Sequence, residues 1–256
     1  MWFLQRGAAM RMKRWVVGTV AVLGIVVGLW RLSNARSFQA FGELYQRVET
    51  PERVVALTFD DGPGPANTPV VLELLARHQV KATFFMVGRN IEQHRELAAR
   101  VLAEGHQLGN HSYSHRRMVL SSPSFIEEEI SRTDALLREV GARGEILFRA
   151  PFGKKLFTLP WILSRQGRKH ITFDVVPDDH ATQDAALITS RVLEATRPGS
   201  IILLHDGGAT KPGTIEAAGR IIESLKAQGY RFVTVSELLA LGGSSTAPDP
   251  HAAARP

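Results

Sequence analysis

Short apolar segments alternate with amphipathic ones between residues 53 and 241 of this 256-residue chain. The apolar segments are rich in β-branched and aromatic residues, as buried parallel strands are. They predict strands at Val54–Phe59, Ala82–Val87, Gln107–Asn110, Ile146–Arg149, His170–Val175, Ser200–Leu204 and Arg231–Val235. Apolar positions at helical spacing predict helices at Val70–His78, Ile91–Glu104, Phe125–Val140, Asp184–Thr196, Thr214–Gln228 and Ser236–Leu241. This alternation implies βαβ units and an α/β fold with a parallel sheet.

Turn residues mark the expected ends of these elements. Thr68 and Ser122, each followed by proline, predict helix starts, and glycines follow several predicted helices. The number of strand–helix units suits a barrel better than an open sheet, although the pattern alone leaves closure open. Residues 242–256 are rich in Gly, Ser, Ala and Pro without periodicity, which predicts a disordered tail.

An uncharged apolar stretch runs from Trp15 to Trp30. As a helix it would span about 24 Å, between a long signal-peptide core and a short membrane anchor. The stronger positive cluster on its N-terminal side predicts that this end stays in the cytoplasm. We expect an uncleaved anchor, with cleavage after Ser33-Asn34-Ala35 as the alternative. Either way, the residues after Arg36 should lie outside the cytoplasm, membrane-anchored in the first case and secreted in the second.

These features divide the chain into four parts. Residues 1–36 are a cytoplasmic stub with the anchor or signal, 37–52 a linker, 53–241 the catalytic domain and 242–256 the tail. The formal charge of +6 does not indicate nucleic-acid binding, because six basic residues flank the apolar stretch and the rest is near neutral. The absence of cysteine rules out disulfides and cysteine–zinc sites. We expect a monomer.

Ionisable residues follow directly on several predicted strands. They are Asp60 and Asp61, His111, Arg149, Asp178 and Asp179, and His205 and Asp206. In a parallel α/β barrel the carboxyl ends of the strands form one face, where active sites are built. Helix capping and turns could explain one or two of these positions, but they are a weak explanation for the full set.

His111 and His115, together with one of the adjacent aspartates Asp60 and Asp61, form a candidate metal site. The two histidines are four residues apart, so on one helical turn they would share a face. Three protein ligands leave a coordination position open, which is typical of a catalytic metal. Zinc is the default ion for two histidines and one aspartate, although cobalt, nickel or manganese would fit. The other carboxylate of the Asp60-Asp61 pair is then available as a general base.

The remaining candidates supply charge stabilisation and an acid. Arg149 can pair with the base carboxylate, and a backbone N–H of its turn, such as that of Phe152, can donate to an oxyanion. A plain structural turn explains this segment equally well. His205 can protonate the leaving group, and Asp178 or Asp179 can hydrogen-bond its imidazole and raise its pKa. The other histidines are read as surface or incidental: His78, His94, His106, His170 and His251.

These residues resemble the motifs of the polysaccharide deacetylases, carbohydrate esterase family 4, from about Arg53 to Leu241. The matching segments are Thr-Phe-Asp-Asp-Gly-Pro at 58–63, His-Ser-Tyr-Ser-His at 111–115, Arg-Ala-Pro-Phe-Gly at 149–153 and Leu-Leu-His-Asp at 203–206. The resemblance implies a distorted (β/α)₇ barrel that removes N-acetyl, sometimes O-acetyl, groups from polysaccharides by metal-activated water.

The resemblance also implies roles for single residues. Asp60 would be the base, Asp61, His111 and His115 the metal ligands, and His205 the acid. Arg149 would steady Asp60, the amide of Phe152 would help to bind the oxyanion, and Leu203 would line the acetyl pocket.

One further motif departs from the family pattern. Family members carry Asp-x-x-Asp-Trp where this chain has Val176-Pro-Asp-Asp179-His180. Asp179 is retained and would orient His205, whereas His180 replaces the tryptophan of the acetyl pocket wall. The expected function is N-deacetylation of a peptidoglycan- or chitin-like polymer of the cell envelope. The alternatives are an O-acetyl polysaccharide esterase and a catalytically impaired glycan-binding homologue.

Overall fold

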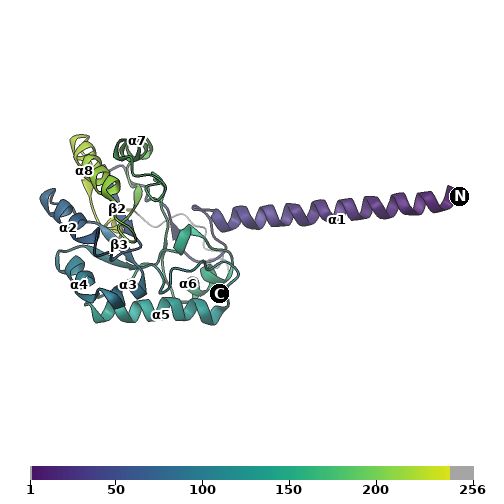
Figure 1. Cartoon of the computed structure of the whole chain (residues 1–256), viewed down its shortest axis with the longest axis horizontal. Coiled ribbons are helices and arrows are strands. Elements are labelled where there is room, and N and C mark those ends of the chain that lie inside the picture. The colour runs from purple at the N-terminus through teal and green to yellow at the C-terminus, as the bar shows by residue number, and fades with distance from the viewer. Residues whose placement is uncertain (1, 243–256) are drawn as a thin grey trace, which may run out of the picture.

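The computed structural model describes the backbone of residues 2–242 and the side chains of residues 15–242. A long helix, α1 (Trp2–Asn34), projects from an α/β domain that the other elements form (Figure 1). The predicted tail lies outside the described residues, apart from Gly242.

Parallel strands form the centre of the domain. Four of them pair in the order β4–β3–β2–β6, and the short strand β7 also pairs with β2. Their bounds are β2 (Val54–Asp60), β3 (Thr83–Met86), β4 (Gln107–Asn110), β6 (Ile201–His205) and β7 (Arg231–Phe232). The predicted α/β fold with parallel strands is confirmed.

Two predicted strands are shorter than expected. Ile146–Arg149 forms only single bridges, from Phe148 to Asn110 and to His170, and His170–Val175 is reduced to β5 (His170–Ile171) and a bridge at Val175. The carboxylate of Asp174 accepts hydrogen bonds from the backbone N–H of Ile201 at 2.9 Å and from the Ser200 hydroxyl at 2.9 Å. A side chain therefore takes the place of a backbone partner, and the regular ladder stops there.

Helices surround the sheet (Figure 1). They are α2 (Thr68–Arg77), α3 (Gly88–Gln93), α4 (Arg95–Ala103), α5 (Pro123–Glu139), α6 (Thr158–Arg165), α7 (Ala185–Ala195), α8 (Pro212–Ala227) and α9 (Val235–Leu241), with the 3₁₀ turn η1 at Pro151–Gly153.

Three features of the helices and of the last strand differ from the prediction. The expected helix Ile91–Glu104 is two helices, because His94 leaves helical geometry at φ −134° and ψ 50°. Helix α6 was not expected. The expected strand Arg231–Val235 ends at Phe232, because Thr234 and Glu237 form a capping box that starts α9.

The predicted cap at Thr68 is wrong, whereas the one at Ser122 is confirmed. The Ser122 side chain accepts the backbone N–H of Phe125. Thr68 instead lies inside α2, and its hydroxyl donates to the buried carboxylate of Asp206 at 2.5 Å. This bond joins the start of α2 to the end of β6, beside the predicted site.

The segment predicted as a linker, residues 37–52, packs on the domain. Strand β1 (Leu44–Tyr45) pairs in parallel with β5, and the Val48 side chain is buried in the core. The domain therefore begins before residue 53.

The residues of β2 alternate between two buried layers. Val55, Leu57 and Phe59 pack into the core beneath the helices. Val54 and Ala56 point to the other face, among Ile171, Leu203 and their neighbours. Because side chains alternate along a strand, Thr58 and Asp60 also point to this inner face. The strand thus carries a polar pair into the interior at its carboxyl end.

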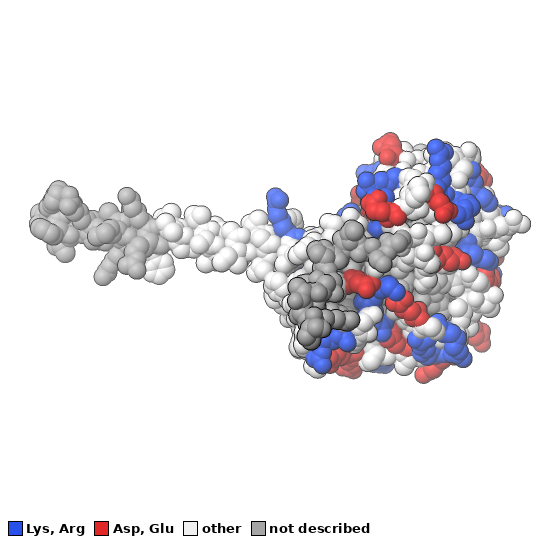
Figure 2. Space-filling view, turned by 180° about the vertical axis from the view of Figure 1, so that it is seen from behind, with Lys and Arg blue, Asp and Glu red and all other residues white. Residues whose placement is uncertain are grey.

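Helix α1 is apolar over its second half. Trp15–Asn34 is a 20-residue segment with a mean hydropathy of 1.9, and 6% of an 18-residue stretch within it is buried. By length and composition it can cross a membrane. Figure 2 shows this contrast: positive and negative side chains intersperse over the visible face of the domain, whereas the described part of α1 is almost free of charge.

Candidate active site

The carboxyl ends of β2 and β6 bring the first site residues together. The strands pair in register, so Asp60 lies directly beside His205. Asp61 follows as the chain leaves β2 with φ 72°, a left-handed conformation that turns its side chain away from the strand pattern. The two adjacent aspartates therefore face different partners, as their roles would require.

Asp61, His111 and His115 converge on one point. The Oδ1 atom of Asp61 lies 3.4 Å from Nε2 of His111 and 3.0 Å from Nε2 of His115. All three offer ligand atoms within 4.8 Å of one another. Their side chains come from two separate loops, which follow β2 and β4.

The spacing of the two histidines predicted that they share one helical turn, but they do not. Residues 111–115 form a loop in which Ser112 and His115 have positive φ, 64° and 57°. The Ser112 hydroxyl accepts the backbone N–H of His115 at 3.1 Å. Left-handed conformations of non-glycine residues are costly and gather at functional sites. Here they aim both imidazoles at one carboxylate.

The trio fits a divalent metal. Among the described residues, Asp61 Oδ1 is a buried oxygen without a hydrogen-bond partner. Nδ1–H of His111 donates to the backbone carbonyl of Arg149 at 2.8 Å, which leaves Nε2 as a lone-pair donor toward Asp61. Metal-binding histidines are oriented in this way.

Charge at the trio also favours ionised Asp61. Burial opposes ionisation, but the close imidazoles of His111 and His115 outweigh it and lower the pKa of the Asp61 carboxyl below its usual range. An ionised carboxylate beside two imidazoles is the donor set that zinc and similar ions bind.

Asp60 is a second buried carboxylate, and Arg149 holds it. Nη1 of Arg149 donates to Asp60 Oδ1 at 2.6 Å and to the Thr58 hydroxyl at 2.7 Å. The guanidinium is fully buried and also donates to the carbonyls of Ile171 and Thr172. Loss of one partner of such a pair leaves an uncompensated charge, at a cost of about 3–5 kcal/mol.

His205 pairs with Asp179 rather than with Asp178. Nδ1–H of His205 donates to Asp179 Oδ1 at 2.8 Å, and its backbone N–H donates to Oδ2 at 3.0 Å. Burial disfavours the imidazolium, but Asp179, with Asp60 and Asp61 farther off, raises the pKa of His205 above its usual value. Asp178 is exposed and pairs with Arg191.

Phe152, Leu203 and His180 occupy the edges of the site. The exposed ring of Phe152 lies 4.6 Å from that of His115, and φ at Phe152 is 60°. Leu203 is buried on β6 beside Thr58. His180 is exposed, and its ring meets that of His205 edge-on at 5.8 Å.

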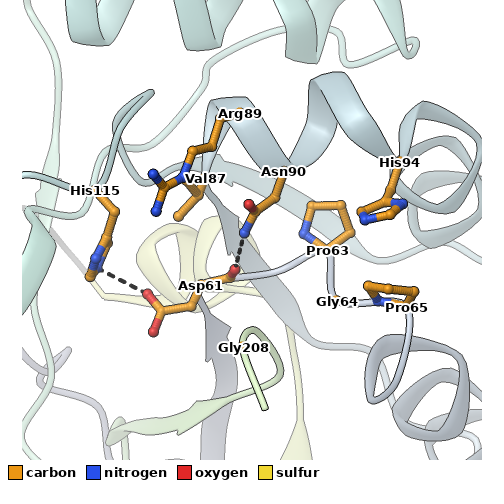
Figure 3. Close-up of a pocket in the computed structure, with 10 residues that line it drawn as sticks. All are labelled: Asp61, Pro63, Gly64, Pro65, Val87, Arg89, Asn90, His94, His115 and Gly208. Atoms are coloured by element: carbon orange, nitrogen blue, oxygen red, sulfur yellow. Dashed lines mark hydrogen bonds and ion pairs between the residues drawn. The ribbon is translucent and has the colours of Figure 1, made fainter. Parts of the chain in front are cut away.

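A cavity of about 340 Å³ opens beside Asp61 and His115 (Figure 3). Its wall includes Arg89 and Asn90 of α3, which the sequence pattern did not single out. The Asn90 side chain donates to the backbone carbonyl of Asp61 at 2.8 Å and so fixes the turn after β2. The signal that could have identified Arg89 and Asn90 is that a helix starts directly after β3.

Three histidines differ from the prediction of surface or incidental positions. His94 lines the cavity, and His106 and His170 are buried. His106 Nδ1 accepts the backbone N–H of Ala82 at 3.2 Å, and burial lowers the pKa of its imidazole to about 4. The sequence does not distinguish a buried neutral histidine from a loop histidine, because neither hydrophobic periodicity nor turn residues identify it. His251 lies outside the described residues.

The comparisons with known proteins agree with this geometry. The family model of polysaccharide deacetylases matches residues 47–171. A peptidoglycan-N-acetylglucosamine deacetylase of Bacillus cereus is 36% identical over 206 residues, which are 80% of this chain and 96% of that protein.

Solved structures share the fold. The crystal structure of a peptidoglycan N-acetylglucosamine deacetylase in complex with an N-oxidanyl-benzamide compound aligns with a TM-score of 0.72 at 34% identity, over 75% of this chain and 91% of the other. A pseudoenzyme of carbohydrate esterase family 4 from Bacillus anthracis aligns with a TM-score of 0.72 at 26% identity, over 80% and 72%.

The alignments with these relatives cover most of both chains. The segment that the family model matches contains Asp60, Asp61, both histidines of the trio and Arg149. The expected enzyme class, a hydrolase that deacetylates polysaccharides, agrees with these relatives. The chain belongs to the polysaccharide deacetylase family, as its motifs predicted.

Proposed function

We propose that the protein is a metal-dependent N-deacetylase of an envelope glycan, acting on N-acetylglucosamine units outside the cytoplasm. The observation that carries the proposal is the meeting of Asp61, His111 and His115 beside an Asp60–Arg149 pair and a His205–Asp179 pair. A ligand set, a base and an acid around one point are what hydrolysis of an amide requires.

Asp61, His111 and His115 are the residues that would hold the ion. When bound there, a divalent metal supplies Lewis acidity, which can lower the pKa of water from 15.7 to about 7. Zinc is the first choice for this donor set, and cobalt, nickel or manganese would also suit it.

Asp60 and His205 divide the proton transfers. Water adds to the acetamide carbonyl carbon as Asp60 accepts its proton. The carbon–nitrogen bond then breaks as Nε2–H of His205 protonates the departing nitrogen, which leaves acetate and a free amine. The Phe152 amide would donate to the oxyanion, and Leu203 and His180 would bound the acetyl pocket. Asp179 accepts from Nδ1–H of His205 and stabilises the imidazolium, whose second proton, on Nε2, is then available to the departing nitrogen.

The same proposal covers architecture and location. The single bridges at Phe148 and Val175 link β4 through β5 to β6, which supports a distorted parallel barrel. Relatives that act on peptidoglycan support an extracytoplasmic enzyme, with α1 as its anchor.

Acetate release tests the proposal. The full chain, purified in detergent, is incubated with N-acetylglucosamine oligomers, peptidoglycan and acetylated xylan, with chelator and with added zinc. We expect metal-dependent acetate from the first two substrates. Asp60→Asn should abolish release while bound metal stays constant, whereas Asp178→Asn, at an exposed acid near the site, should change neither. Absence of release by a metal-loaded protein contradicts the proposal.

The same experiment distinguishes two other functions. O-acetyl ester cleavage needs less help for its leaving group, so preferential release from acetylated xylan would favour an esterase. A catalytically impaired homologue is favoured by Val176 and His180 and by the pseudoenzyme among the similar structures. The base and all three ligands are present here, which argues against impairment.

A further inference from the structure

The base of α1 is fastened to the domain without a free linker. The backbone N–H of Lys155 donates to the Ser33 carbonyl at 3.1 Å. The ammonium groups of Lys154 and Lys155 donate to the Asn34 side chain and the Ala35 carbonyl. The Thr172 hydroxyl donates to the Arg36 carbonyl at 2.7 Å. These bonds fix where the helix leaves the domain.

The length of the apolar segment places this junction at a membrane surface. Twenty helical residues, Trp15–Asn34, span about 30 Å, the thickness of a hydrocarbon core. The Ser33 side chain, near the end of this segment, is already buried by the domain. No linker separates the apolar segment from the domain, so an inserted α1 brings the surrounding domain surface against the lipid headgroups (Figure 1).

That surface exposes large aromatic side chains. Phe38 and Phe41, in the segment after α1, are 57% and 43% exposed. Phe157 and Trp161, at the start of α6, are 45% and 39% exposed. The two groups are neighbours, because a Cβ on Gly42 would lie 3.0 Å from the Ser164 side chain of α6. Helix α6 also follows shortly after the lysines that hold α1.

Charged groups accompany these aromatic residues. The Arg165 guanidinium lies 4.9 Å over the Trp161 ring, and Arg31 and Arg36 are exposed at the base of α1. The segment after α1 also carries three exposed acids, Glu43, Glu49 and Glu52. Aromatic rings with basic neighbours suit the boundary between acyl chains and anionic headgroups.

We infer that Phe38, Phe41, Phe157 and Trp161 form a second membrane contact, a seat that holds the domain on the lipid surface around α1. The inference rests on the anchoring proposed for α1. Its occupant is the bilayer into which α1 inserts, and its rings would enter the headgroup boundary.

Fluorescence of Trp161 in lipid vesicles tests the seat. The chain has four tryptophans, so Trp2→Phe, Trp15→Phe and Trp30→Phe together leave Trp161 as the only emitter. The full-length protein is reconstituted into vesicles of phosphatidylglycerol and phosphatidylethanolamine with spin-labelled lipids. We expect quenching that places Trp161 near the headgroup boundary, about 15 Å from the bilayer centre, half the thickness of the hydrocarbon core.

A matched control carries the emitter on the opposite end of the domain. It keeps the three substitutions above and adds Trp161→Phe and Val70→Trp. Val70 is 42% exposed on α2, a helix that lies far from α1 in Figure 1. This emitter should not be quenched. A third variant retains only Trp30 and reports insertion of α1 itself.

Each result is decisive. Quenched Trp30 with Trp161 no more quenched than the control at position 70 overturns the seat and leaves the anchor intact. Unquenched Trp30 overturns both. A Trp161 signal that responds to soluble glycan fragments but not to lipid quenchers assigns the aromatic surface to substrate and also overturns the seat. Acetate release on the same samples tests the catalytic proposal separately.

Discussion

Two trios with the same residue types lie in one site and are built for different chemistry. Asp61, His111 and His115 form the first, and Asp179, His180 and His205 the second; in each, the ligand atoms lie within 4.8 Å of one another. The first trio holds a buried carboxylate oxygen without a hydrogen-bond partner. In the second, both Asp179 oxygens accept hydrogen bonds, from His205 and from Thr214.

The difference shows why composition alone does not identify a metal site. A buried oxygen without a donor carries an electrostatic deficit that a cation can fill. A carboxylate already surrounded by N–H and O–H donors has no such deficit, and it orients a proton instead. We therefore propose that the first trio binds the metal and that the second transfers the proton.

Removal of one histidine from each trio gives the largest expected contrast. His115→Ala should lose the bound ion and lower acetate release by on the order of a thousandfold, because a catalytic metal contributes several kcal/mol. His180→Ala should keep one ion per chain. Metal content by elemental analysis checks both variants. Two ions bound to the wild type, or one lost from His180→Ala, would erase the distinction between the trios.

Loss of the acid should have a smaller and substrate-dependent effect. His205→Asn should reduce amide hydrolysis by about 10²–10⁴-fold, the usual contribution of a positioned acid. It should retain more activity on an acetyl ester, whose leaving group needs less protonation. Turnover of both substrates measures the ratio, and metal content should match the wild type. Equal losses on both would argue against an acid role.

The smallest expected effect is a shift in pH dependence. Asp179 raises the pKa of His205, so Asp179→Asn should lower it. Since the acid must be protonated to act, the alkaline limb of the rate profile should move to lower pH. Profiles of kcat for both proteins test this. An unchanged alkaline limb would mean that Asp179 serves only the backbone N–H of His205 and Thr214.

The sequence predicted the site residues better than their setting. Asp60, Asp61 and His205 could be placed because each ends a strongly apolar strand, and parallel strands bring such ends together. The convergence of His111 and His115 was predicted on a helical turn, but the loop that produces it could not be predicted. It depends on left-handed conformations at Ser112 and His115, and single residues of these types carry no signal for them.

Short-range polar contacts explain the remaining differences. Asp174 interrupts a strand, Thr234 starts a helix inside one, and Thr68 reaches Asp206 instead of capping α2. In each case one side chain changes the local structure that the apolar pattern indicates. The contacts of Asp174 and Thr68 depend on partners far away in the chain, which periodicity does not contain, whereas Thr234 and Glu237 form a local capping box.

The buried Arg149 has a consequence for where the catalytic unit starts. Its guanidinium bonds the carbonyls of Ile171 and Thr172, and the backbone N–H of Thr172 in turn donates to the Tyr45 carbonyl. Through these bonds, the stretch just after α1 supports the arginine that holds Asp60. A cut at residue 53, where the apolar pattern begins, would take away this brace and loosen the base from a distance. The stretch that follows α1 thereby supports chemistry that it does not contact.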